Sequence, residues 1–361
     1  MAEQIVVLAV HLLESLHTSE KLSLLDAAPN EGDFRRLCRV DVERIIGRRL
    51  KIREFSAVRL LEAASSDLKY LTQAQIAYTF YWNSDYPPLL RETYEPPFVL
   101  YYRGHLPEPS LPLMAIVGTR RPTGVALRTT FELAAEFGIS GIAVVSGLAR
   151  GVDSAAHRGN IHGGGKTVAV LGSGIDTIYP SSNRRLAEAI LDSGGMICSE
   201  FAPGVPPLKY HFPGRNRIIS GLSRGVVVTE APAGSGALIT ADFCLEQGRD
   251  LYVHEQGLSG VNAEGCRALA ENGAPVISSA RQVLADWYGG IECGKSDAQT
   301  RRNGGRHDRS ELDFGTLNES EDTGKALADL MRQELSGTIT RQYGAYFRSS
   351  DLWQIRRSTP C

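Results

Sequence analysis

The sequence lacks several patterns, and each absence excludes a class of protein. None of its apolar runs approaches 18 residues, and the N-terminus has no basic region followed by an apolar core and a cleavage site. Neither a membrane span nor a secretory signal is therefore predicted. The six cysteines are scattered and form no CxxC pair, which argues against a zinc site or a disulfide framework and fits a reducing cytoplasm. We expect a cytoplasmic protein that binds no metal and does not enter a membrane.

Acidic residues are also missing from one long segment. Residues 201–229 contain no Asp or Glu but include the basic residues Lys209, Arg215, Arg217 and Arg224. The formal net charge is only −2, so binding to nucleic acid would depend on a local patch of this kind. The segment also contains an aromatic ring, Phe212. Cations can bind the phosphates of a sugar-phosphate backbone while such a ring stacks on an unpaired base. The adjoining helix start, Arg215-Asn216-Arg217, is expected to hold a flanking phosphate. The alternative is a solvated helix end anchored by Phe212.

The chain divides into several segments. In residues 1–75, apolar positions recur every three or four residues, which predicts a small helical domain whose last helix spans Glu54–Ala64. Residues 76–112 are rich in proline and aromatic residues and predict strands that lead into the next domain. Their aromatic side chains suit buried packing of edge strands better than a base-stacking strip. Residues 291–323 read as a polar, glycine-rich linker. Residues 324–361 form a short segment of undefined fold, with one helix expected at 324–335.

Residues 112–288 alternate short apolar runs with amphipathic stretches. The runs are Leu113–Val117, Ile142–Val145, Thr167–Leu171, Met196–Ser199, Gly225–Thr229, Leu251–Val253 and Pro275–Ile277. Continuous apolar strands separated by helices indicate a parallel sheet covered on both faces. With right-handed crossovers, this predicts an α/β fold of the extended Rossmann-like type, with a doubly wound, mostly parallel sheet across residues 76–290.

Glycine-rich loops follow four of these predicted strands. They contain Gly118-Thr119-Arg120, Ser146-Gly147 through Arg150, Gly172-Ser173-Gly174 and Gly234-Ser235-Gly236. In a doubly wound sheet, ligands bind beyond the carboxyl ends of the strands. Backbone N–H groups and helix N-termini at such loops attract anions. Four such loops, two of them with arginine, predict a phosphate-binding rim.

Known nucleotide and catalytic motifs do not fit the chain. Each pair of closely spaced glycines lacks the final glycine of G-x-G-x-x-G, and Gly165-Lys166-Thr167 precedes a strand instead of opening a helix. No nucleotide cofactor is therefore expected. Ser146, Asp153 and His157 invite a catalytic-triad interpretation, but the serine is not in a G-x-S-x-G elbow. Capping and packing roles are favoured for Asp153 and His157. Glu230 is expected to order the glycine loop or a nearby arginine.

The chain resembles the DprA family, also called Smf, the DNA-processing proteins of bacterial transformation. The motifs that carry the resemblance are Gly118-Thr-Arg120, Ser146 to Asp153, Leu171 to Asp176, Tyr179-Pro180-x-x-Asn183, Ser199-Glu200-Phe201, Phe212 to Ser223 and Ser235 to Thr240. They occur in family order across roughly residues 70–288. The chain departs from the pattern at Val125-Ala126, where the family has Tyr-Gly, and at His254-Glu255, where it has Val-Pro. The winged-helix pattern with which many members end is not evident here.

The resemblance implies a non-enzymatic protein that binds single-stranded DNA without sequence preference, forms a homodimer and helps load the RecA recombinase during natural transformation. It also implies that Arg120 and Lys209 contact phosphates, that Phe212 stacks on a base, and that the N-terminal helices form a SAM-like domain. The alternative is a nucleotide-processing enzyme like the phosphoribohydrolases of related fold. The residues expected to bind nucleic acid are Thr119, Arg120, Gly147, Arg150, Lys209, Phe212, Arg215, Asn216, Arg217, Gly234, Ser235 and Gly236.

Overall fold

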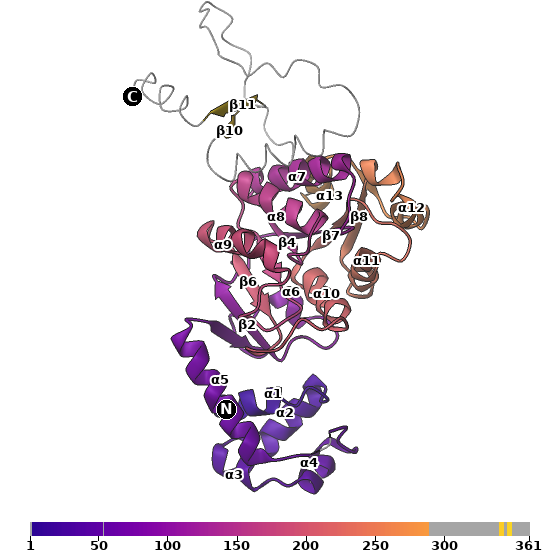
Figure 1. Cartoon of the computed structure of the whole chain (residues 1–361). Helices are drawn as coiled ribbons and strands as arrows, with labels where there is room; N and C mark the ends of the chain where they lie inside the picture. Colours follow the sequence, from indigo (N-terminus) through magenta and orange to yellow (C-terminus); the bar gives the residue numbers. More distant parts are fainter. Residues whose placement is uncertain (1, 53, 289–338, 343–344, 349–361) are drawn as a thin grey trace, which may run out of the picture.

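The structure is a computed structural model that describes residues 2–52, 54–288, 339–342 and 345–348 (Figure 1). Five helices begin the chain: α1 (Gln4–His11), α2 (Thr18–Ala27), α3 (Glu31–Arg36), α4 (Arg39–Ile46) and α5 (Ala57–Gln73). Their positions agree with the helical pattern of the first 75 residues, although α5 continues nine residues beyond the expected Ala64. Among the described residues, none of the helices has the length and apolar character needed to cross a membrane.

A nine-stranded sheet forms the centre of the molecule. Its strand order is β1-β2-β6-β5-β4-β3-β7-β8-β9, with β1 and β2 antiparallel and the other seven strands parallel. The strands are β1 (Ala77–Phe80), β2 (Val99–Gly104), β3 (Leu113–Val117), β4 (Ala143–Ser146), β5 (Val168–Val170), β6 (Met196–Ser199), β7 (Gly225–Val228), β8 (Asp250–His254) and β9 (Val276–Ile277). The predicted α/β fold with a mostly parallel, doubly wound sheet is confirmed.

Helices cover both faces of this sheet. The helices are α6 (Pro88–Arg91), α7 (Gly124–Ile139), α8 (Val152–His162), α9 (Arg184–Asp192), α10 (His211–Leu222), α11 (Gly236–Glu246), α12 (Glu264–Glu271) and α13 (Ala280–Tyr288), with short 3-10 turns at Ser181–Asn183 and Glu255–Leu258. Alternate residues of β3 divide between two buried clusters. Met114 and Ile116 pack with α7, α8 and α13, whereas Ala115 and Val117 pack with α10 and α11. The continuous apolar run of this strand is therefore explained by burial on both faces.

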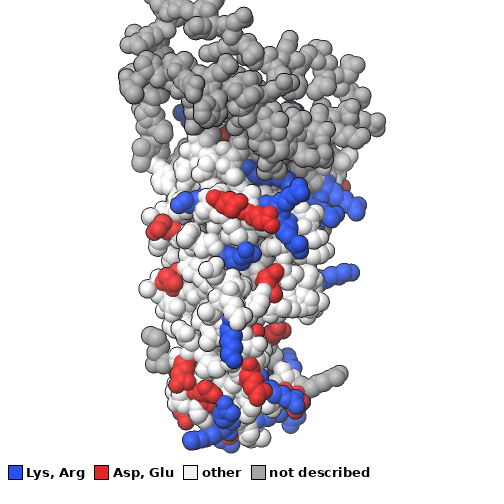
Figure 2. Space-filling view, turned by 60° about the vertical axis from the view of Figure 1, so that its left-hand side comes forward, with Lys and Arg blue, Asp and Glu red and all other residues white. Residues whose placement is uncertain are grey.

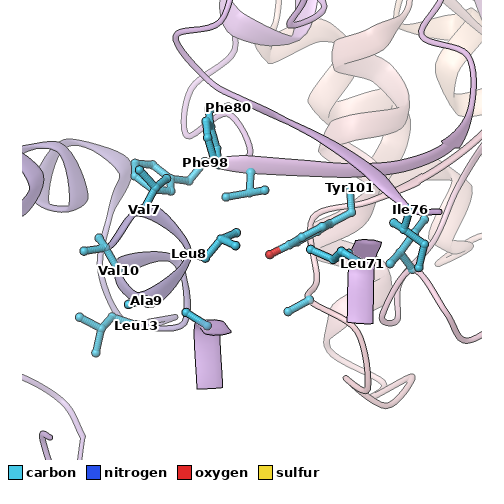
Figure 3. Packing of buried hydrophobic residues seen from close by; sticks show 14 of the residues in the cluster. Val7, Leu8, Ala9, Val10, Leu13, Leu71, Ile76, Phe80, Phe98 and Tyr101 are labelled. Atoms are coloured by element: carbon cyan, nitrogen blue, oxygen red, sulfur yellow. The ribbon is translucent and has the colours of Figure 1, made fainter. Parts of the chain in front are cut away.

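The N-terminal helices pack against the antiparallel edge of the sheet. Val7, Leu8 and Leu71 lie in one cluster with Phe80 and Tyr101 (Figure 3). The aromatic side chains of β1 and β2 are thus largely buried in packing, as favoured over a base-stacking strip. Figure 2 shows acidic and basic side chains interspersed over these helices at the bottom of the view, and several of them form ion pairs within one helix.

The order of the strands places one end of β3 at a topological switch point. The chain proceeds from β3 to β4 on one side, and later returns to β7 on the other side. Crossovers that leave in opposite directions open a crevice beyond the carboxyl ends of β3 and β7.

A short hairpin of β10 (Ile339–Gln342) and β11 (Ala345–Arg348) follows near the end of the chain. The expected linker at 291–323 and helix at 324–335 lie outside the described residues.

Candidate nucleic-acid interface

A cavity of about 770 Å³ occupies the crevice at the switch point. Three segments supply most of its lining: residues 117–121 after β3, residues 207–219 around the start of α10, and residues 232–240 after β7. These segments are far apart in sequence and meet here because β3 and β7 are adjacent parallel strands. Of the twelve residues predicted to bind nucleic acid, nine line this cavity: Thr119, Arg120, Lys209, Phe212, Arg215, Asn216, Gly234, Ser235 and Gly236.

The accessible charges of the cavity are all positive. Arg120, Arg121 and Lys209 are exposed, and Asp153 is the single carboxylate among the lining residues. Asp153 is buried, and its Oδ2 accepts hydrogen bonds from the backbone N–H groups of Gly147 (3.1 Å) and Ala149 (3.2 Å). Burial raises the pKa of Asp153, against the opposing effects of Arg215 and these two amides. The carboxylate therefore shapes the loop after β4 and leaves the positive rim without an accessible counter-ion.

Phe212 is half-buried beside the rim and contacts another aromatic ring. Its ring centroid lies 5.6 Å from that of Tyr179, with an interplanar angle of 44°. The Cζ atom of Arg120 lies 5.5 Å from the centroid of Phe212, within cation–π range. An aromatic ring and an exposed cation thus stand side by side. Tyr179, which is 48% exposed, was missed among the predicted site residues, although its Tyr-Pro step follows the third glycine loop.

The loop after β7 presents the N-terminus of α11 to the same cavity. Ser235 caps the helix by accepting a hydrogen bond from the N–H of Ala237 (3.3 Å). Gly234 has a φ of +70°, a conformation that side-chain-bearing residues seldom adopt. The Nδ2 of Asn216 donates to the carbonyl oxygen of Gly236 (3.1 Å) and so ties α10 to this loop. The resulting helix start, beside Lys209, can accept an anion.

Arg215 is placed differently from the expectation that it contacts phosphate. It is only 4% exposed, and its Nη1 donates to the carbonyl oxygens of Gly147 (2.8 Å) and Val170. Burial lowers its pKa to about 10, a shift that the nearby Asp153 opposes. A Cβ atom on Gly147 would lie 2.6 Å from this Nη1, so Gly147 makes room for the guanidinium. Both residues build the interior beneath the cavity.

A helical pattern in the sequence contains the signal for this burial. Arg215 falls on a stripe of buried positions spaced four, three and four residues apart, formed by His211, Arg215, Ile218 and Leu222. Side chains at these spacings share one face of a helix. The apolar members of the stripe show that this face points inward.

Two further predicted residues lie outside the cavity lining. The Nη2 of Arg217 bonds the carboxylate of Glu200, and both side chains are mostly buried. Arg150 is exposed and directly follows Ala149, which does line the cavity. Arg150 is therefore an exposed cation next to the cavity, whereas Arg217 is engaged in an ion pair.

The structure does not assemble the residues of the possible catalytic triad. The hydroxyl of Ser146 donates to the carbonyl oxygen of Ile116 (2.7 Å), and the Nδ1 of His157 bonds the hydroxyl of Thr167 (2.7 Å). Burial lowers the pKa of His157 to about 3, so this ring is neutral at pH 7 and serves packing.

Glu230 orders a neighbouring loop. It is 3% exposed. Its carboxylate accepts hydrogen bonds from the hydroxyl of Thr123 (2.6 Å) and the Nδ2 of Asn262 (2.8 Å). These bonds fix the loop between β3 and α7, not the glycine loop after β7. Among the described residues, no group of three or more His, Cys, Asp or Glu side chains could hold a metal ion.

Comparisons with known proteins agree with this geometry. A family model described as DNA recombination-mediator protein A matches residues 77–288. The DNA processing protein DprA of Streptococcus pneumoniae is 41% identical over 206 residues, which cover 56% of this chain and 71% of the relative. The solved structure of DprA from the same organism superposes with a TM-score of 0.65 and 32% identity over 79% of this chain and 99% of the other. A second solved structure gives insight into the single-stranded DNA binding mode of DprA from Helicobacter pylori. It superposes with a TM-score of 0.51 and 28% identity over 58% of this chain and 95% of the other.

Proposed function

This chain belongs to the DNA recombination-mediator protein A family, and from that premise we propose that it binds single-stranded DNA without sequence preference. The observation that carries the proposal is the composition of the cavity at the switch point. Exposed Arg120 lies over the ring of Phe212 and exposed Lys209 lines the same cavity, while the single carboxylate among the lining residues is buried and hydrogen-bonded. Cations neutralise phosphates and release condensed counterions. The ring provides a stacking surface that every base can use.

Preference for single strands follows from the aromatic contact. Phe212 and Tyr179 can stack only on a base whose face is not already covered by its neighbours in a duplex. Stacking contributes about 1–3 kcal/mol per base and tolerates every sequence, because each base has a π-face. Phosphate contacts made by Arg120 and Lys209 add affinity without reading the sequence. Thr119, Arg150, Asn216 and the loop from Gly234 to Gly236 complete the interface that we propose.

We also infer that the protein binds DNA without chemically altering it. A phosphoribohydrolase-like reaction would require an accessible carboxylate near the bound sugar. Glu230 does not line the cavity and is held by Thr123 and Asn262, and Asp153 is buried against backbone amides. These placements support a binding protein over the alternative enzyme.

The wider role is proposed from family membership. We infer that the protein protects incoming single-stranded DNA in the cytoplasm, acts as a homodimer, and helps load the RecA recombinase during transformation. The description of the family as recombination mediators supports this role. Strand exchange by RecA on DNA coated with single-strand-binding protein, measured with and without this protein, tests it. An unchanged rate of exchange would refute the mediator role while leaving DNA binding intact.

Fluorescence anisotropy with labelled oligonucleotides tests the proposed binding. We expect affinity for single strands to exceed that for duplexes and to fall steeply with salt. Arg120→Ala and Lys209→Ala should each reduce the log–log salt slope by about one. Phe212→Ala should cost about 1–3 kcal/mol on single strands and much less on duplexes.

The control is Lys69→Ala, which removes an exposed cation on α5 that does not line the cavity. A nucleoside-monophosphate hydrolysis assay run alongside tests the rival enzyme. A salt slope near zero, or hydrolysis at an enzymatic rate, would refute the proposed function.

A further inference from the structure

A second cavity, of about 260 Å³, lies between the N-terminal helices and the first turn of α10. His11 and Lys21 line it from the N-terminal helices, and Glu200, Phe201, Tyr210 and His211 line it from the other side. The cavity therefore adjoins the helix that carries Phe212. None of the contacts described above for the proposed DNA interface uses it.

One wall of this cavity is aromatic. The rings of Phe201 and His211 stack with centroids 4.1 Å apart and an interplanar angle of 26°. The ring of Tyr210 meets His211 edge-on at 4.6 Å and is itself 70% exposed. An exposed tyrosine above a stacked pair provides a surface for another flat ring.

Two buried imidazole atoms have no hydrogen-bond partner. The Nδ1 atoms of His11 and His211 are buried and unpartnered among the described residues. The side chain of His211 is 6% exposed. Burial, helped by the charge of Lys21, holds the pKa of His11 well below its usual range, so its ring is neutral. Buried polar atoms without partners are costly, so a turn of either ring that brought its Nδ1 to a hydrogen-bonding ligand in the cavity would be favourable.

The charges of the lining favour a neutral ligand over an anion. Glu14 and Glu200 line the cavity, and Lys21 is the single cation among its lining residues. Glu200 also bonds Arg217. A phosphate would meet two carboxylates here, whereas the rim of the first cavity has none that is accessible. The two histidines do not belong to any group that could hold a metal ion in the described part of the chain.

The start of α10 separates the two cavities by a single helical turn. Lys209, Phe212 and Pro213 line the first cavity, while Tyr210 and His211, which lie between them in sequence, line the second. A strand that crosses the first turn of α10 therefore meets both cavities in succession.

We propose that the cavity between the N-terminal helices and α10 receives an unpaired nucleobase, the neighbour of the one that stacks on Phe212. The inference rests on the proposed function. The base stacks on Tyr210, and its polar edge meets the imidazoles of His11 and His211. Its phosphates remain outside, on the side of Lys209. The N-terminal helices thereby become part of the DNA-binding surface.

An abasic scan of the shortest oligonucleotide that the wild-type protein binds with full affinity, which leaves a single binding register, tests the proposal. One abasic residue is placed at each position in turn, and the affinity of the wild-type protein is measured by anisotropy. We expect two positions at which loss of the base weakens binding about tenfold. Phe212→Ala should abolish the sensitivity at one position, and Tyr210→Ala should abolish it at the other.

Two further variants sharpen the result. Val205→Phe adds volume to the lining of the second cavity without removing a polar group, and should abolish the same sensitivity as Tyr210→Ala. Tyr94→Ala removes a tyrosine that is 85% exposed and lines neither cavity, and should leave the scan unchanged. Thermal unfolding checks that each variant is folded. Because Tyr210 is exposed, its replacement decides the test even if Val205→Phe does not fold.

The outcomes separate this inference from the function on which it rests. If Phe212→Ala removes one sensitive position while Tyr210→Ala leaves the profile unchanged, the second site is refuted and the first stands. A uniform loss of affinity in Tyr210→Ala, equal for every abasic position, also refutes it. If no position is sensitive and Phe212→Ala binds like the wild type, the proposed function itself fails.

Discussion

Replacing Arg215 tests whether this buried cation stabilises the fold, in contrast to the exposed Lys209, for which we propose a contact with DNA. Arg215→Ala removes a guanidinium that is 4% exposed and that donates to the carbonyl oxygens of Gly147 and Val170. It also leaves the buried carboxylate of Asp153 without the charge that most strongly opposes the rise in its pKa. Removing one partner of a buried charge pair typically costs about 3–5 kcal/mol. Domains of this kind have a total stability of about 5–15 kcal/mol. The variant should therefore lose about a fifth or more of its free energy of unfolding.

Urea denaturation followed by tryptophan fluorescence measures this loss. With a slope of about 3 kcal/mol per molar urea, the midpoint should fall by about 1 M or more. Lys209→Ala is the matched control, because Lys209 is exposed on the same cavity. It should unfold at the wild-type midpoint and bind single-stranded DNA more weakly. Arg215→Lys keeps the charge but loses the planar fork, so its midpoint should lie between those of Arg215→Ala and the wild type.

DNA binding by the folded fraction of Arg215→Ala completes the comparison. Because the guanidinium is bonded to the main chain beneath the cavity, the salt slope per folded molecule should match that of the wild type. If the variant instead unfolds at the wild-type midpoint and its salt slope drops by about one, Arg215 contacts a phosphate and the reasoning is wrong.

Three further predictions follow from individual contacts. Gly172→Ala places a Cβ about 2.9 Å from the Cδ1 of Phe212; we expect displacement of the ring and, by anisotropy, weaker binding to single strands with little change on duplexes. Because Arg120 lies over the ring of Phe212, the losses in Arg120→Ala and Phe212→Ala should not add, and a double-mutant cycle should give a coupling of about 0.5 kcal/mol or more; a sum within about 0.3 kcal/mol would contradict the shared contact. The pKa of buried His157 is about 3 in the folded protein, against an ordinary 6.5, so the unfolded chain takes up the proton first and stability falls as the pH drops from 6.5 toward 3. At pH 5 this costs about 2 kcal/mol, and His157→Gln should show a correspondingly flatter pH profile of unfolding; a profile equal to that of the wild type would contradict it.

The sequence predicted the sheet well because its pattern reports burial directly. Leu113–Val117 and Met196–Ser199 are continuous apolar runs whose observed bounds match the predicted ones. Both strands are covered on two faces, so the single polar residue in either is the buried Ser199 at the end of β6. The end of α5 was predicted less well. The helix continues to Gln73 although Ser65, Ser66 and Asp67 interrupt its apolar pattern, because tertiary packing of residues such as Leu71 extends it.

The candidate site was predicted only in part, because residue type does not reveal exposure. Lys209 and Arg215 are both cations of the same acid-free segment, yet one is exposed and the other is internal. The difference depends on the phase of α10, since Lys209 precedes the helix and Arg215 lies on its inward face. Contacts between segments that are far apart in the chain could not be predicted from the sequence. The approach of Arg120 and Tyr179 to Phe212 depends on the order of strands in the sheet.

The positive charge of the cavity at the switch point depends mainly on the lack of accessible carboxylates among its lining residues. The chain has 39 basic and 41 acidic residues, so a surface of average composition would give no net electrostatic attraction for nucleic acid. We expect three exposed cations, Arg120, Arg121 and Lys209, to suffice for binding at the cavity, because no accessible carboxylate lies among its lining residues. The one acid present, Asp153, is buried and bonded to the backbone, and buried Arg215 lies near enough to oppose the rise in its pKa. On the N-terminal helices, by contrast, acidic and basic side chains form ion pairs, and their charges cancel. A protein of slightly negative charge can therefore hold a polyanion at one site, provided that this site keeps its cations unpaired.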